Sequence, residues 1–73
     1  MKFVSYIEKD LDSGTYFGTI PSIPGAHTQA ETLDELQKNL KEVVSLCLEE
    51  MNSEEKKSIP EFVGLQQVEI DLD

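Results

Sequence analysis

A few side chains in this sequence could carry chemistry, and two aspartates are the first to consider. Asp10 and Asp12 lie two residues apart in the stretch KDLDSG, and carboxylates at the end of a strand can hold magnesium for phosphodiester cleavage. Such a site needs further acids. Glu42 falls opposite the apolar face of a predicted helix, and the interior of the first predicted strand has no acid. We therefore interpret Asp10 and Asp12 as turn residues and expect no metal and no cofactor.

The single histidine and the single cysteine are equally isolated. A general base needs a nucleophile or an orienting acid beside it, and only Thr28 adjoins His27, so we interpret His27 as a partly exposed strand residue. Cys47 falls in an apolar helical stripe between Val44 and Leu48, where a free cysteine behaves as a small hydrophobe. The sequence has no glycine-rich phosphate loop, basic patch or nucleophile elbow, and we expect no enzymatic activity.

The elements that would position these residues can be inferred from alternation and periodicity. Alternating or β-branched and aromatic stretches predict strands, and an apolar arc recurring at about 100° per residue predicts a helix. Thr32 and Glu35 form a capping-box pattern at the start of that helix. The predicted strands are 2–8, 15–20, 26–31 and 65–73, and the predicted helix is 33–51. The chain 1–73 is then a single α+β domain of the order β-β-β-α-β.

The connections suggest how the sheet is ordered. The first two strands form a hairpin closed at 9–14, where Gly14 can take a positive φ. A right-handed helical crossover then lays the last strand parallel to the first, which gives the sheet order 3-2-1-4 with the helix on one face. Pro21, Pro24 and Gly25 make a stiff corner between the second and third strands. That structural role is sufficient to explain the corner.

Composition limits the class of protein. Fifteen acidic against six basic residues give a net charge of −9, which disfavours direct binding of DNA or RNA and favours basic partners. One cysteine excludes an intramolecular disulfide. No apolar run is long enough to span a membrane, and the alternating N-terminus is unlike a signal peptide. We expect a soluble cytoplasmic protein.

One helix covers only one face of such a sheet. The other face would carry Val4 and Tyr6, or Phe17, depending on the register. Exposed aromatic and branched side chains on a small sheet favour association, so we expect a homodimer or a tetramer.

Several of these pieces together resemble the HicB family of antitoxins. They are the acidic, glycine-containing turn, the aromatic strand, the P-x-x-P-G corner, the small residue before the helix cap and the amphipathic helix, in 8–17, 20–25, 28–30 and 32–35. Ile59-Pro60-Glu61 before the last strand also fits, so the resemblance covers about residues 3–72. The chain ends at Asp73, without the DNA-binding domain that many members append. We expect either that this chain does not bind operator DNA or that it is part of a longer protein.

The resemblance implies a partial RNase H-like fold without the nuclease site. It also implies neutralisation of HicA, a small basic toxin that cleaves mRNA, by covering the toxin's RNA-binding surface. The candidate docking residues combine the acidic turn, an aromatic residue and the corner: Asp10, Asp12, Tyr16, Pro21, Ile23, Pro24 and Gly25. Two alternatives stay open: the corner serves only the strand reversal, or the chain is a stand-alone protein- or ligand-binding module without a toxin.

Overall fold

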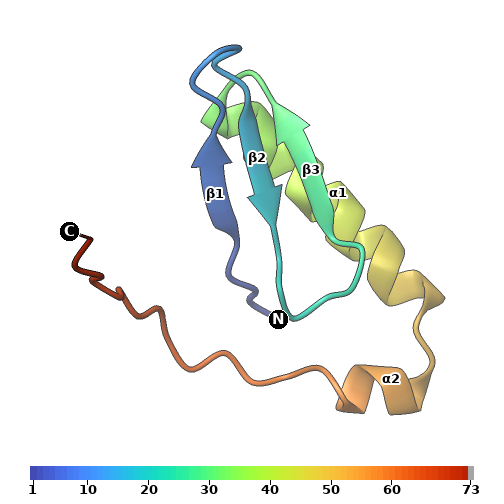
Figure 1. The fold of residues 1–73 in the computed structure, drawn as a ribbon. Helices are drawn as coiled ribbons and strands as arrows, with labels where there is room; N and C mark the ends of the chain where they lie inside the picture. Colours follow the sequence, from blue (N-terminus) through green and yellow to red (C-terminus); the bar gives the residue numbers. More distant parts are fainter. Residues whose placement is uncertain (73) are drawn as a thin grey trace.

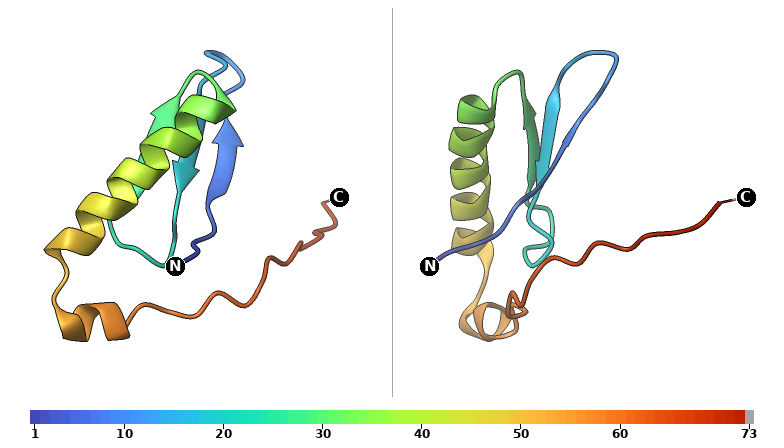
Figure 2. Two further views of the ribbon diagram at one scale, coloured as in Figure 1. Left: turned by 180° about the vertical axis from the view of Figure 1, so that it is seen from behind. Right: turned by 90° about the vertical axis from the view of Figure 1, so that its left-hand side faces the viewer.

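The chain folds into a three-stranded antiparallel sheet with one long helix on one face, as a computed structural model describes it for residues 1–72. The strands are β1 (Tyr6–Lys9), β2 (Tyr16–Thr19) and β3 (His27–Ala30), and the sheet order is β1-β2-β3. The helices are α1 (Leu33–Glu50) and a short α2 (Ser53–Lys57). Figure 1 shows α1 behind β2 and β3, and the turned views of Figure 2 show the sheet and α1 as two layers.

The hairpin and the long helix confirm the sequence-based expectations. Each observed strand lies within one or two residues of its predicted range, except that β1 begins only at Tyr6. Gly14 has φ 75° and Gly25 has φ 82°, as their turns require. Thr32 Oγ1 accepts a hydrogen bond from the Glu35 backbone N–H at 3.1 Å, which satisfies one of the free donors at the start of α1.

The core lies between α1, β2, β3 and the corner that joins the two strands. The buried apolar residues are Ile20, Ile23, Ala26, Ala30, Leu36, Leu40 and Val44. Three of them come from the apolar stripe of α1, and Val43, Cys47, Leu48 and Met51 of the same stripe pack against them. Leu33, which also belongs to the predicted stripe, is 52% exposed at the first residue of α1.

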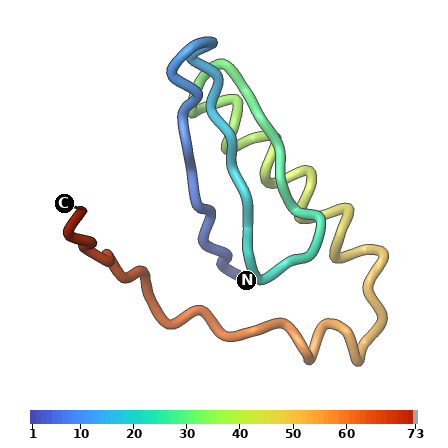
Figure 3. The backbone as a smooth tube through the Cα atoms, viewed as in Figure 1, coloured from blue at the N-terminus to red at the C-terminus, as the bar shows by residue number. Residues whose placement is uncertain are grey.

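The prediction of a fourth strand at 65–73 is wrong for the single chain, as far as its described residues show. Residues 65–72 form no strand; they run in an extended path away from the sheet, and Asp73 lies outside the described residues (Figure 3). The sheet order 3-2-1-4 is therefore not formed. Alternation of apolar and polar side chains shows that a segment suits a half-buried strand, but it does not supply the neighbouring strand, and no described strand lies beside this tail.

The segment that follows α1 contains the short helix α2. Asn52 caps it, accepting a hydrogen bond from the Glu55 backbone N–H at 2.8 Å, and Glu55 Oε1 accepts one from the Asn52 backbone N–H at 3.1 Å. Two reciprocal bonds stabilise the first turn of a helix that buries no side chain. Neither helix of the described residues has an apolar stretch long enough to cross a bilayer.

Candidate protein-binding face

The side of the sheet that faces away from α1 is uncovered. Register decides which side chains lie there: Tyr6 pairs with Thr19, and Glu8 with Phe17, while Phe17 pairs with Gln29 and Thr19 with His27 on the other side of β2. Because side chains alternate along a strand, these six residues share one face. We call it the open face and define it as Tyr6, Glu8, Phe17, Thr19, His27 and Gln29.

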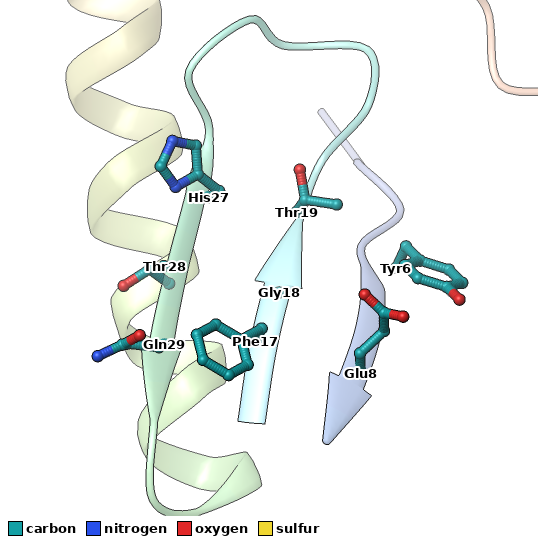
Figure 4. A pocket seen from close by; sticks show the side chains of 8 residues that line it. All are labelled: Tyr6, Glu8, Phe17, Gly18, Thr19, His27, Thr28 and Gln29. Atoms are coloured by element: carbon teal, nitrogen blue, oxygen red, sulfur yellow. The ribbon is translucent and has the colours of Figure 1, made fainter. Parts of the chain in front are cut away.

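The open face is slightly hollowed. These residues, together with Gly18 and Thr28, line a depression of about 380 Å³ (Figure 4). Tyr6 is 52% exposed and Phe17 is 42% exposed, so two aromatic rings are partly in solvent on this face. The sequence left Tyr6 and Phe17 as alternatives because the register was unknown. The structure places both on the same face, where Glu8 lies beside Tyr6 on β1 and the Phe17 ring leans toward Gln29 of β3 (Figure 4).

The acidic turn lies at one end of the open face, directly after β1. Asp10 accepts hydrogen bonds from Ser13 Oγ at 2.7 Å and from the Asp12 backbone N–H at 3.4 Å. These two donors, Ser13 first, hold the pKa of the Asp10 carboxyl below its ordinary value because they stabilise its charged form. The turn is closed by backbone bonds between Asp10 and Thr15 and between Gly14 and Asp10, both at 2.8 Å. Both aspartates are exposed, so the turn presents fixed negative charge to solvent.

The proline corner lies at the opposite end of the sheet, after β2 (Figure 1). Its backbone bonds to itself from Ile20 to Ala26 at 2.9 Å and from Ala26 to Ile23 at 3.1 Å. Ile23 is only 2% exposed, because the corner folds its side chain into the core, while Pro21 and Pro24 remain at the surface. The corner closes the core as well as reversing the strand.

The structure therefore does not bring the seven sequence-derived site residues into one surface. Asp10 and Asp12 are at one end of the sheet, and Pro21, Pro24 and Gly25 are at the other. Tyr16 lies on the α1 side of the sheet, partly buried, with Lys9 Nζ 5.5 Å from its ring centroid. Ile23 is in the core. Sequence reasoning missed His27 and Gln29 as neighbours of Phe17, since only the register of β3 places them there.

The described residues gather no three histidine, cysteine or acidic side chains in an arrangement that could hold a metal ion. Glu42 is exposed on the outer side of α1, as expected, and His27 is exposed on β3. Cys47 packs against the core with its Sγ 3.9 Å from the Pro24 carbonyl oxygen. What the open face offers is a contact surface: two aromatic rings, amide and hydroxyl groups, and acids along one end.

Comparison with known proteins assigns this arrangement to a family. A family model described as a HicB-like antitoxin of bacterial toxin-antitoxin systems matches residues 3–73. The chain belongs to the HicB-like antitoxin family. This confirms the resemblance that the turn, corner and helix cap suggested, and the match covers nearly the whole chain.

Relatives of this HicB-like chain occur in both bacteria and archaea. It is 49% identical over 70 residues to a UPF0150 protein of Archaeoglobus fulgidus, covering 96% of each chain. It is 45% identical over 67 residues to a UPF0150 protein of Synechocystis, covering 92% of this chain and 91% of the relative. A UPF0150 protein of Thermotoga maritima is 41% identical over 69 residues, covering 94% and 89%. No solved structure matches this HicB-like chain.

Proposed function

We propose that this HicB-like chain is the antitoxin of a type II toxin-antitoxin pair. It binds a HicA-like, mRNA-cleaving toxin and covers the toxin's RNA-binding surface. The observation that carries the proposal is the open face, where Tyr6 and Phe17 stand exposed beside Glu8 on the side of the sheet that α1 leaves bare. Family membership supports an antitoxin role and the open face supplies a surface for it.

Aromatic side chains suit the centre of such an interface. Tyrosine is enriched among the residues that dominate binding energy, and aromatic rings give large contact area at the cost of few rotatable bonds. Tyr6 and Phe17 are mounted on paired strands, so their backbone loses little freedom when a partner binds. We assign them the anchoring role in toxin binding.

Negative charge suits the rim. Glu8 lies on the open face, and Asp10 and Asp12 extend the acidic edge beyond the end of β1. The ribonuclease partner must carry a basic surface to hold RNA phosphates, and a chain of net charge −9 is attracted to that surface. Acids at the rim accelerate the encounter and fix its orientation, whereas the aromatic centre slows dissociation.

The proline corner has a supporting part in this proposal. Pro21 and Pro24 stiffen the end of the sheet remote from the acidic turn, and Ile23 ties the corner to the core. A partner that spans the open face from the turn would reach the exposed prolines and Gly25 only if its footprint covers the length of β2. Tyr16 and Ile23 act indirectly, by holding β2 and the corner against α1.

Neutralisation requires no chemistry from this chain. If the toxin's basic surface is occupied by the open face, RNA phosphates cannot reach the catalytic groups of the toxin. Inhibition is then stoichiometric, reversible and sensitive to salt, because part of the attraction is between exposed charges.

The experiment is an mRNA cleavage assay with the basic protein encoded beside this chain. Toxin, RNA and increasing amounts of the chain are mixed, and intact RNA is measured. We expect protection to saturate at a fixed ratio of chain to toxin and to weaken at high salt. Full cleavage in the presence of a large excess of folded chain would refute the proposal. A heat-denatured sample of the same chain serves as the control for nonspecific effects of an acidic polymer.

A further inference from the structure

The outer edge of β1 is a free strand edge. Within residues 1–72, β1 pairs with β2 on one side and with nothing on the other. The N–H and C=O groups along that side therefore lack strand partners, which makes the edge a template for another strand. Charged side chains, which can discourage pairing at a strand edge, occur only at Glu8 and Lys9 of β1, whereas Ser5, Tyr6 and Ile7 are uncharged.

The α1 side of this edge is also short of cover. Ile7 pairs with Gly18 and shares its face, the face on which Leu36 and Leu40 of α1 lie over Gly18. Yet Ile7 is 46% exposed, because α1 packs over β2 and β3 and stops short of β1 (Figure 2). Beside it, a hollow of about 660 Å³ runs between residues 1–5 and one flank of α1, lined by Phe3, Leu40, Val44 and Leu48 among others. An apolar strip thus follows the free edge.

The C-terminal tail has apolar side chains that could cover this strip, but in the single chain they stay exposed. Val68 is 81% exposed, Ile70 72% and Leu72 90%, and polar residues alternate with them. Such alternation suits a strand with one buried face. At about 3.3 Å per residue, residues 66–72 are long enough to pair along the whole of β1.

The tail runs away from the apolar strip beside β1 of the same chain. Ile59 packs against the core, so the tail is anchored at its start. Residues 59–65 pass beside Met1–Val4 and the corner. From there the chain projects outward on the side of the open face, opposite α1, while the strip lies on the α1 side (Figures 2 and 3). An arm that extends beyond its own domain is placed to reach a second molecule.

We propose that residues 66–72 of one copy add to the free edge of β1 in a second copy, and that the second copy returns its own tail in the same way. The apolar side chains of the added segment cover Ile7 and fill the hollow beside α1. Each sheet then has four strands, and the order 3-2-1-4 arises between two chains. The exchange is reciprocal, so it closes as a twofold homodimer. Pairing at the edge leaves the open face free.

The proposal is tested on the full chain by mass in solution. Light scattering at tens of micromolar should give the mass of two chains for the parent. Val68→Ser combined with Ile70→Ser should give the mass of one chain, since both buried contacts are lost. The matched control, Gln67→Ser with Glu69→Ser, changes two residues on the opposite face of the same segment and should stay dimeric. Circular dichroism confirms that all three proteins retain α1.

Mixed labelling distinguishes pairing of the tail with β1 of a second chain from pairing with β1 of the same chain. An equimolar sample of isotope-labelled and unlabelled parent protein is refolded together, and isotope-filtered NMR records contacts between β1 and tail amides. We expect contacts between labelled and unlabelled chains. A monomeric parent, a dimer that persists in the Val68 and Ile70 variant, or tail-to-β1 contacts confined to one chain would each overturn the proposal.

Discussion

Gly18 of β2 lies directly beneath Leu40 of α1. A Cβ atom at Gly18 would come within 3.1 Å of Leu40 Cδ1, 3.2 Å of Ser5 Oγ and 3.3 Å of Leu36 Cδ2. All three distances are shorter than ordinary contact, and both leucines are buried. The helix rests on the sheet at this glycine, on the side of β2 opposite the open face.

Gly18→Val should therefore destabilise the fold. The added isopropyl group would push against three neighbours at once, and overpacking of this kind costs about 1–3 kcal/mol. Thermal or urea unfolding measures the effect. Gly64→Val is the matched control, since nothing lies within 4 Å of that position, and we expect a change below about 0.5 kcal/mol. Equal stability of the two variants would contradict the close approach of α1 to β2.

Leu40→Ala should lower the free energy of unfolding by about 2–5 kcal/mol, as truncation of buried leucines does. Leu40 is 4% exposed at the centre of the core. Leu46→Ala on the outer side of the same helix is the control, because Leu46 is 61% exposed and loses little buried contact. An unchanged unfolding midpoint for Leu40→Ala would mean that the apolar stripe is not the core.

The acidic turn should show a pH signature. Because the pKa of Asp10 is held below 3.8 by Ser13 and the Asp12 backbone, its titration followed by NMR should have a midpoint below that value. Ser13→Ala removes the first donor and should raise the midpoint. A pKa that is lower in the folded state than in the unfolded state stabilises the fold at any pH above the ordinary pKa of aspartate. This contribution is lost as the pH falls through the pKa of the folded state. A midpoint that is unaffected by Ser13→Ala would contradict the role of that hydrogen bond.

Charge reversal at the turn should slow toxin binding without unfolding the chain. Asp10→Lys with Asp12→Lys is expected to lower the association rate and to flatten its dependence on salt, because the encounter loses favourable charge at the rim. Glu49→Lys with Glu50→Lys makes the same change of net charge at the far end of α1 and should have a smaller effect. If the two double variants slow association equally, net charge alone steers the encounter, and the acidic turn is not the docking site.

The sequence predicted the elements that are encoded locally. The spacing of Leu36, Leu40 and Val44 is enough to define the buried stripe of α1, and Thr32 marks its start. Gly14 identifies the hairpin turn because its positive φ is tied to residue type. For α2 the signal was also local, since Asn52 and Glu55 have capping-box spacing, but the charged residues around them obscured it.

Features that depend on distant partners could not be predicted in this way. Burial of Ile23 depends on the corner folding under α1, and five residues are too few to show periodicity. Placement of Tyr6 and Phe17 on one face required the register of the hairpin. For the tail, alternation at Val68 and Ile70 correctly indicates a strand-forming segment, but the strand beside it must come from elsewhere in space, and the single chain leaves that place empty.

The central claim, that the open face binds the toxin, is tested most directly by the affinity of the chain for its cognate toxin when Tyr6 and Phe17 are both changed to alanine. Truncation of two anchoring aromatics at about 2 kcal/mol each is expected to weaken binding by nearly a thousandfold, since about 1.4 kcal/mol is a factor of ten, and to abolish protection of mRNA. Leu46→Ala, on the outer side of α1, should bind as the parent does. A folded Tyr6 and Phe17 double variant with parental affinity would contradict the account.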